Sequence, residues 1–277
     1  MRTVPILEAF SDADMQRALL AGLLAVVATS LVGTWMVLRG MSLIGDALAH
    51  GIIPGLALAT LWSFNLTLGA AVSALVMVIG ITVVSQRSPL PEDTGVGLLF
   101  VGMLALGVVI ASTGSSADGL EDVLFGNVLG VSRAGLLMQA LAALLVLAAT
   151  VLAYRAFLAL SFNPAKAASL GLRPSLAHAA MLALVAMAVV SSFQVVGSLL
   201  VFGLLIAPPA TAALVVRRVW LCMVVAVLVG WLAVVVGLVI SYYGDTAAGA
   251  TMAGVAVGFF FLVLLGQELT AAVRRAR

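Results

Sequence analysis

The fold class of this chain is decided by Val219–Tyr243, which reads VWLCMVVAVLVGWLAVVVGLVISYY. The stretch contains no charged residue, and it is longer than the roughly 20 apolar residues that a helix needs to cross a bilayer. The rest of the chain has the same character, since 64% of its 277 residues are hydrophobic and 9% are charged. Globular domains carry about 25% charged residues, so this composition excludes a soluble protein. We therefore predict an all-α integral membrane protein.

Similar apolar runs recur along the chain and predict about nine transmembrane helices. The expected spans are Arg17–Leu38, Asp46–Trp62, Leu66–Val84, Asp93–Ala111, Ala134–Phe157, Ser175–Ser192, Val196–Val216, Val219–Tyr243 and Thr246–Glu268. The second span is short and contains Pro54, so we expect it to be kinked or to cross only part of the bilayer. A count of eight is the alternative, if Ser175–Val216 does not form a full helical hairpin.

The basic residues give the expected orientation, because cytoplasmic loops of membrane proteins carry an excess of Lys and Arg. With nine spans and the C-terminus inside, all of the 13 Lys and Arg residues except Arg2, Arg17 and Arg133 fall on the cytoplasmic side. We therefore expect residues 1–16 to form a short extracytoplasmic segment. Residues 17–268 form the transmembrane domain, with a cytoplasmic loop at 161–174, and residues 269–277 form a cytoplasmic tail.

One ionisable pair, Asp46 and His50, lies inside an expected span. Residues four apart lie on one face of a helix, and a carboxylate and an imidazole placed in this way can bind one divalent cation together. Ionisable groups inside a bilayer are costly, and they commonly mark the path of an ion or a substrate. The alternative is a structural role, in which Asp46 caps the helix and His50 pairs with it.

Other kinds of site have little support in the sequence. The single cysteine, Cys222, excludes a disulfide within the chain and a cysteine-based metal cluster. Neither a His-Glu-x-x-His motif nor an apposed Ser/His pair indicates an intramembrane enzyme, so we expect no catalytic residues. The basic residues are scattered and predict no nucleic-acid partner. The second histidine, His178, falls near the cytoplasmic end of its span, where we expect an interfacial role.

The longest polar cytoplasmic stretch, Ser161–Pro174, predicts a short helix between two spans. Asn163 can cap this helix with Pro164 at its first position, and Gly171 can end it. Such a helix could dock a partner chain, and an ordinary ordered loop is the alternative. The chain has no Gly-x-x-x-x-Gly-Lys-Ser/Thr loop to bind nucleotide phosphates. If ATP drives transport, a separate subunit must bind and hydrolyse the ATP.

Several stretches match one known family. They are Leu38–His50, Pro91–Phe100, Glu121–Asn127, Ser161–Pro174, Gly197–Val201 and Ala207–Ala212. On these stretches the chain resembles the permease subunits of bacterial ABC importers for zinc, manganese and iron ions. The resemblance runs from Leu20 to Leu265. It implies a fold like that of the vitamin B12 importer permease, with one span fewer at the N-terminus, in a bacterial plasma membrane.

The resemblance also implies partners and residue roles. It implies a homodimer with the transport path at its interface, two cytoplasmic ATPase subunits and an extracytoplasmic solute-binding protein. The family's metal-contacting Asp and His fall on Asp46 and His50. The segment that couples the permease to the ATPase falls on Asn163, Pro164, Ala165, Lys166, Ala167, Ala168, Ser169, Leu170 and Gly171. The chain departs from the family pattern at Gly51, where Ala or Ser is expected, and at Pro208-Pro209, where a single Pro is usual.

We therefore expect the membrane subunit of an ATP-driven importer for a divalent transition metal ion. The chain itself would not be an enzyme and would hold no permanently bound cofactor. A site of His and carboxylate suits zinc, manganese and iron alike. Among these ions we expect zinc first, and manganese or iron next. The alternative is a secondary carrier that couples cation entry to protons. Such a carrier needs no docking helix, and we would expect it to hold more buried acids than Asp46 alone.

Overall fold

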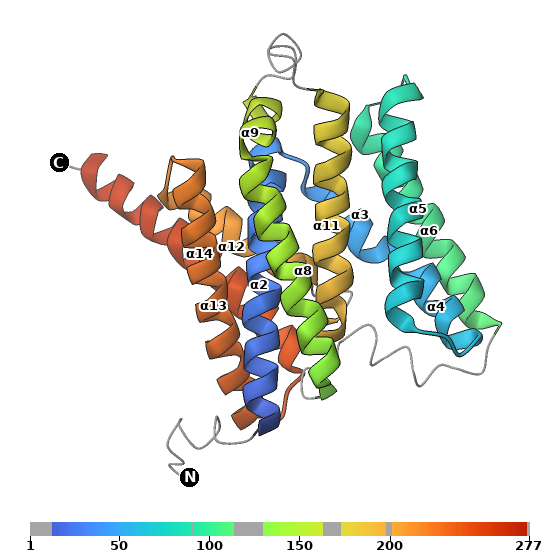
Figure 1. The fold of residues 1–277 in the computed structure, drawn as a ribbon. Helices are drawn as coiled ribbons and strands as arrows, with labels where there is room; N and C mark the ends of the chain where they lie inside the picture. The colour runs from blue at the N-terminus through green and yellow to red at the C-terminus, as the bar shows by residue number, and fades with distance from the viewer. Residues whose placement is uncertain (1–12, 90, 114–129, 163–172, 198–200, 276–277) are drawn as a thin grey trace.

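The computed structural model describes residues 13–89, 91–113, 130–162, 173–197 and 201–275, and these are almost entirely helical. The helices are α2 (Ala13–Arg39), α3 (Ser42–Gly51), α4 (Ile53–Leu61), α5 (Leu66–Arg87), α6 (Glu92–Ser112), α8 (Arg133–Leu152), α9 (Tyr154–Phe162), α11 (Pro174–Val196), α12 (Val201–Val215), α13 (Val219–Gly244) and α14 (Ala248–Arg275). Figure 1 shows them packed side by side, with most of their axes running between the same two ends of the molecule.

Within the described ranges, eight stretches are long and apolar enough to cross a membrane, and one of them, Ser42–Leu61, combines α3 and α4. Each coincides with a span predicted from the sequence, so the all-helical membrane fold is confirmed. The predicted span Val196–Val216 corresponds to α12, which is apolar but shorter than the others. The count of spans is therefore eight without α12 and nine with it, which is the alternative that the sequence left open.

The short helix α12 lies inside the bundle, where it packs against α2, α13 and α14. Its approach to α2 is close, because a Cβ atom at Gly33 would overlap the carbonyl oxygen of Leu205. Pro208 and Pro209 both lie within α12 and are buried. A proline in a membrane helix leaves a carbonyl without its usual N–H donor, which is tolerated where neighbouring protein surrounds the helix. The position of α12 meets that condition.

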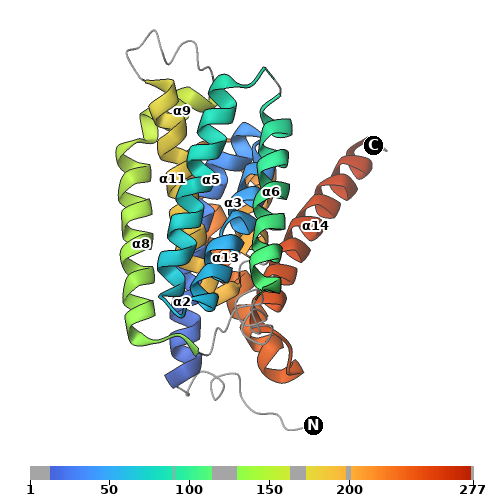
Figure 2. The same ribbon diagram turned by 90° about the vertical axis from the view of Figure 1, so that its right-hand side faces the viewer.

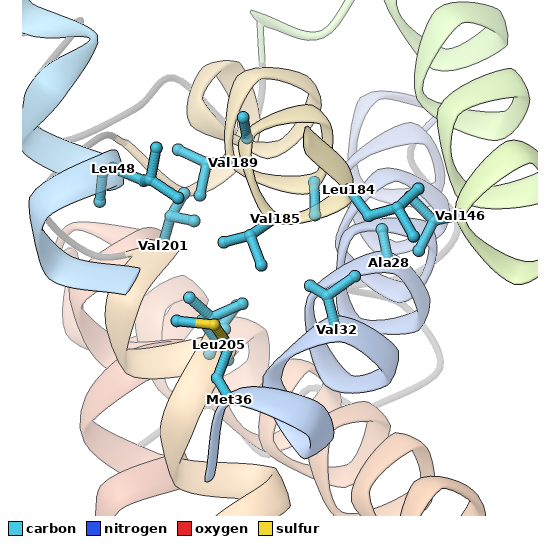
Figure 3. Close-up of a cluster of buried hydrophobic side chains, with 14 of the residues drawn as sticks. Ala28, Val32, Met36, Leu48, Val146, Leu184, Val185, Val189, Val201 and Leu205 are labelled. Atoms are coloured by element: carbon cyan, nitrogen blue, oxygen red, sulfur yellow. The ribbon is translucent and has the colours of Figure 1, made fainter. Parts of the chain in front are cut away.

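The buried core lies where α2, α3, α8, α11 and α12 meet (Figure 3). The labelled side chains there are Ala28, Val32, Met36, Leu48, Val146, Leu184, Val185, Val189, Val201 and Leu205. Because lipid tails are as apolar as these side chains, the hydrophobic effect contributes little to the association of helices within a bilayer. Close packing is therefore what stabilises this core, and Leu48 is the labelled residue of α3 that packs in it.

The two ends of the described chain lie at opposite ends of the bundle. In Figure 1, α2 begins at the lower end, whereas α14 finishes toward the upper end. Figure 2 shows the last turns of α14 leaning away from the other helices. An odd number of passes produces this arrangement, and it fits a chain in which α12 counts as one pass.

Candidate metal site beside a broken helix

The second span is broken into α3 and α4 at Ile52. Pro54 has no N–H with which to reach the carbonyl of His50, and the N–H of Ile52 bonds to that carbonyl instead. On α5, Ser73 Oγ donates a hydrogen bond of 2.7 Å to the carbonyl oxygen of Gly51. The kink predicted from Pro54 is therefore present, and the carbonyls beside it have donors.

Glycines let the neighbouring helices approach the break closely. A Cβ atom at Gly51 would lie 2.9 Å from Met77 Cγ on α5, so Met77 occupies the space that a larger residue would need. This contact gives a reason for glycine at a position where the resemblance predicts Ala or Ser. On the other side, a Cβ atom at Gly107 of α6 would lie 2.8 Å from Ile53 Cγ2 and 3.1 Å from Pro54 N. The break is thus held between α5 and α6.

Asp46 and His50 lie together on α3, as their spacing predicts. His50 Nδ1 lies 3.2 Å from Asp46 Oδ1 and 3.0 Å from the backbone oxygen of Asp46. A carbonyl oxygen only accepts hydrogen bonds, so this contact places a proton on Nδ1. In that tautomer Nε2 carries the lone pair with which an imidazole binds a metal ion. The carboxylate of Asp46 has a second oxygen that can bind the same ion.

The pair lies on the accessible side of α3. The side chain of His50 is 18% exposed and that of Asp46 is 29% exposed. On the opposite side, Ile44 and Leu48 are fully buried, and Figure 3 shows Leu48 beside Val201 of α12. The core therefore fixes α3 by its apolar side and leaves both candidate ligands accessible on the other.

The described residues of one chain offer an incomplete site. Within the residues that the structure describes, no third His, Cys, Asp or Glu joins the pair in a group that could hold a metal ion. Protein metal sites for transition ions usually have four or more ligands. Further donors would therefore have to come from outside these described residues, from water or from another chain.

Phe100 on α6 is a neighbour of the pair that the sequence did not single out. Its ring centroid lies 5.2 Å from that of His50, and the two ring planes meet at 88°. The sequence places Phe100 in a matching family stretch, but it offers no signal that separates this residue from the lipid-facing apolar residues of the same helix. Only the packing of α6 against α3 reveals the contact.

The predicted ATPase-coupling residues, Asn163–Gly171, lie outside the described residues. The structure shows the helices on either side of them, since α9 ends at Phe162 and α11 begins at Pro174. His178, in the second turn of α11, lies with its Nδ1 3.1 Å from Arg39 Nη1 at the end of α2. The second histidine thus contacts a basic residue and takes no part in the Asp46–His50 site.

Comparison with known proteins identifies the family. The family described as "ABC 3 transport family" matches residues 11–267 of this chain. The manganese transport system membrane protein MntC of Listeria monocytogenes is 35% identical over 251 residues, which cover 91% of this chain and 90% of MntC. The chelated iron transport system membrane protein YfeD of Yersinia pestis is 35% identical over 264 residues, covering 95% of this chain and 89% of YfeD.

A solved structure agrees with the sequence relatives. A chain of PsaBC from Streptococcus pneumoniae, in complex with a Fab, superposes with a TM-score of 0.84 at 29% identity. The match covers 93% of this chain and 94% of that one. The family expected from the sequence motifs is thereby confirmed. The chain belongs to the ABC 3 transport family and is a permease subunit of an ABC transporter.

Proposed function

We propose that this permease imports a divalent transition metal ion, with manganese preferred over iron and zinc. The observation that carries the proposal is the Asp46–His50 pair, whose side chains lie 3.2 Å apart on the accessible side of a broken membrane helix. MntC and YfeD, which are similar over almost their whole length, are named for manganese and chelated iron. The donor set suits zinc equally well. Because these relatives are named for manganese and iron, we now place zinc after both, although the sequence alone led us to expect zinc first.

We further propose that the working permease is a homodimer. One chain supplies one carboxylate and one imidazole, and both lie on a side of α3 that its own core leaves accessible. Two copies facing each other would bring two carboxylates and two imidazoles to one ion. That mixture of oxygen and nitrogen donors suits manganese, iron and zinc. Two cytoplasmic ATPase subunits and an extracytoplasmic binding protein complete the proposed importer.

The charges at the helix ends support an orientation with the N-terminus outside the bacterial plasma membrane. Arg39, Arg87, Arg274 and Arg275 lie in the last turns of α2, α5 and α14, and Arg173 and Arg218 come directly before α11 and α13. Figure 1 shows these helix ends toward the upper end of the bundle. The lower end carries Asp14, Arg17, Arg133 and Asp245. Because the cytoplasmic side of a membrane protein carries an excess of Lys and Arg, the upper end faces the cytoplasm in this proposal. Helix α3 then runs outward from that side, and residues 269–277 belong to a cytoplasmic tail.

Transport by the purified importer tests both the energy source and the ion. Permease and ATPase subunits reconstituted together in liposomes, with the binding protein outside, should accumulate manganese only when ATP is supplied. Equimolar zinc should compete less strongly than equimolar iron(II). Uptake that follows an imposed proton gradient without ATP would contradict the proposal and favour the secondary carrier, for which the comparisons give no support. Preferential accumulation of zinc would return zinc to first place.

The coupling segment gives a second test. Replacing Ala168 by Trp should detach or uncouple the ATPase, because small residues at Asn163–Gly171 permit a close approach that an indole would block. Manganese binding at Asp46 and His50 should persist, since the two regions are distinct. Co-purification of the ATPase and ATP-driven uptake are the measurements. Ala247→Trp, at an exposed position near the opposite end of the bundle, is the matched control. If Ala168→Trp retains both coupling and uptake, the segment is not the ATPase contact.

A further inference from the structure

We propose that Phe100 is a positioning residue for transport, whose ring fixes the His50 imidazole in the orientation that presents Nε2 to the ion. The inference rests on the proposed role of His50 in metal binding. Its basis is the perpendicular contact between the two rings, at a centroid distance of 5.2 Å and an interplanar angle of 88°. Aromatic rings prefer such edge-to-face arrangements over stacked ones, so the contact restrains the plane of the imidazole.

The contact is built into the packing of α6 against the broken span. Gly107 sits against Ile53 and Pro54, where any side chain would crowd the break. Phe100 precedes Gly107 by seven residues, and residues seven apart lie on the same face of a helix. The close approach at Gly107 therefore sets the distance at which Phe100, two turns away, meets His50.

Phe100 differs from the residues beside it on α6. Leu98 and Val101 are 65% and 59% exposed, and they face away from the protein core. Phe100 is partly buried and packs against the hydrophobic core. Its ring is therefore held by packing against the protein, unlike the exposed side chains beside it.

Asp46 and Phe100 restrain the imidazole in different ways. Asp46 accepts from Nδ1 through both its side chain and its backbone oxygen, and so it selects the tautomer. A hydrogen bond at one nitrogen still allows the ring to swing about its side-chain torsions, because terminal torsions of this kind are broad. The Phe100 ring limits that swing. Hydrogen-bonding partners that orient a metal-binding histidine commonly change metal affinity by about 10- to 100-fold when they are removed. A ring contact is weaker than such a hydrogen bond, so we place the effect of Phe100 at the low end of that range.

The test compares Phe100→Leu with Phe100→Tyr in the purified permease–ATPase complex. Loss of the ring should raise the manganese dissociation constant about tenfold, whereas the Tyr variant keeps the ring and should bind within about twofold of wild type. The maximal ATP-driven uptake rate per complex should change little in either variant, because saturating manganese restores occupancy. Phe261→Leu is the matched control, since Phe261 also makes an edge-to-face ring contact, with Phe260, but on the exposed side of α14.

His50→Ala in the same assay separates the two proposals. If His50→Ala retains manganese binding and uptake, the proposed metal site itself fails. If His50→Ala loses binding while Phe100→Leu binds as wild type does, the site stands and the positioning role of Phe100 is overturned. A Phe100→Leu complex with a lower yield and an unchanged dissociation constant also overturns it, because the ring would then be only a packing group. Failure of Phe100→Tyr to restore affinity has the same consequence.

Discussion

Replacing either Asp46 or His50 by Ala is expected to abolish metal uptake while the permease still assembles with its ATPase. In the proposed dimer each substitution removes two of the four protein donors, and a transit site with so few ligands retains little affinity. The pair is partly exposed on α3, opposite the side that carries Leu48 into the core. Truncating either side chain therefore leaves the core-facing packing of α3 intact, although His50→Ala also removes the ring contact with Phe100. Whole-cell manganese uptake, with a blot for permease and ATPase in the membrane, is the measurement.

Two variants elsewhere in the chain control for the loss of a charge or an imidazole. His178→Ala removes the other histidine, which contacts Arg39 near the end of α2. Asp14→Ala removes an exposed carboxylate in the first turn of the same helix. Both controls should retain uptake. Near-normal uptake by Asp46→Ala and His50→Ala would instead mean that the pair is structural, with His50 only pairing with Asp46.

Substitution of Gly55 by Ala is expected to destabilise the permease strongly. A Cβ atom at Gly55 on α4 would overlap the carbonyl oxygen of Gly69 on α5, and one at Gly69 would likewise overlap the carbonyl oxygen of Gly55. Backbone atoms cannot move aside as a flexible side chain can, so the helices would have to separate. Overpacking in a core costs about 1–3 kcal/mol, and separating two helices that also support the break places this case at the upper end.

The matched control for Gly55→Ala is Gly97→Ala on α6, where a Cβ atom would meet nothing within 4 Å. Alanine favours a helix over glycine by about 1 kcal/mol, so Gly97→Ala should leave stability unchanged or raise it. The amount of monodisperse protein in detergent and its thermal unfolding midpoint report both effects. Equal yields and midpoints for Gly55→Ala and the wild type would show that α4 and α5 pack less tightly than the structure indicates.

Much of this architecture follows from patterns that lie within single helices. Apolar runs predict the spans because crossing a bilayer requires length and little charge. Pro54 predicts a break because it removes a backbone donor, and the four-residue spacing of Asp46 and His50 predicts that they meet. Each of these inferences depends only on local chemistry.

Features that depend on contacts between helices could not be predicted from the sequence. Frequent glycine indicates close packing, but nothing in the sequence pairs Gly55 with Gly69. The burial of the short helix α12 depends on α2, α13 and α14 surrounding it. Phe100 has the same apolar character as the lipid-facing residues of α6, and only the packing of that helix against α3 distinguishes it. The coupling residues Asn163–Gly171 lie outside the described residues, so their role remains a prediction.

The break at Ile52 has an electrostatic consequence. A helix carries a partial negative charge at its carboxyl end, and α3 ends at Gly51, one residue beyond His50. Helix α4 begins immediately afterwards with an opposing positive end, but Pro54 removes one N–H from its first turn. The N–H of Ile52 and the hydroxyl of Ser73 already bond to the carbonyls of His50 and Gly51, so the carboxyl end of α3 is met by donors at the break. The negative charge that a cation would meet beside His50 is therefore that of the Asp46 carboxylate and not that of the helix end.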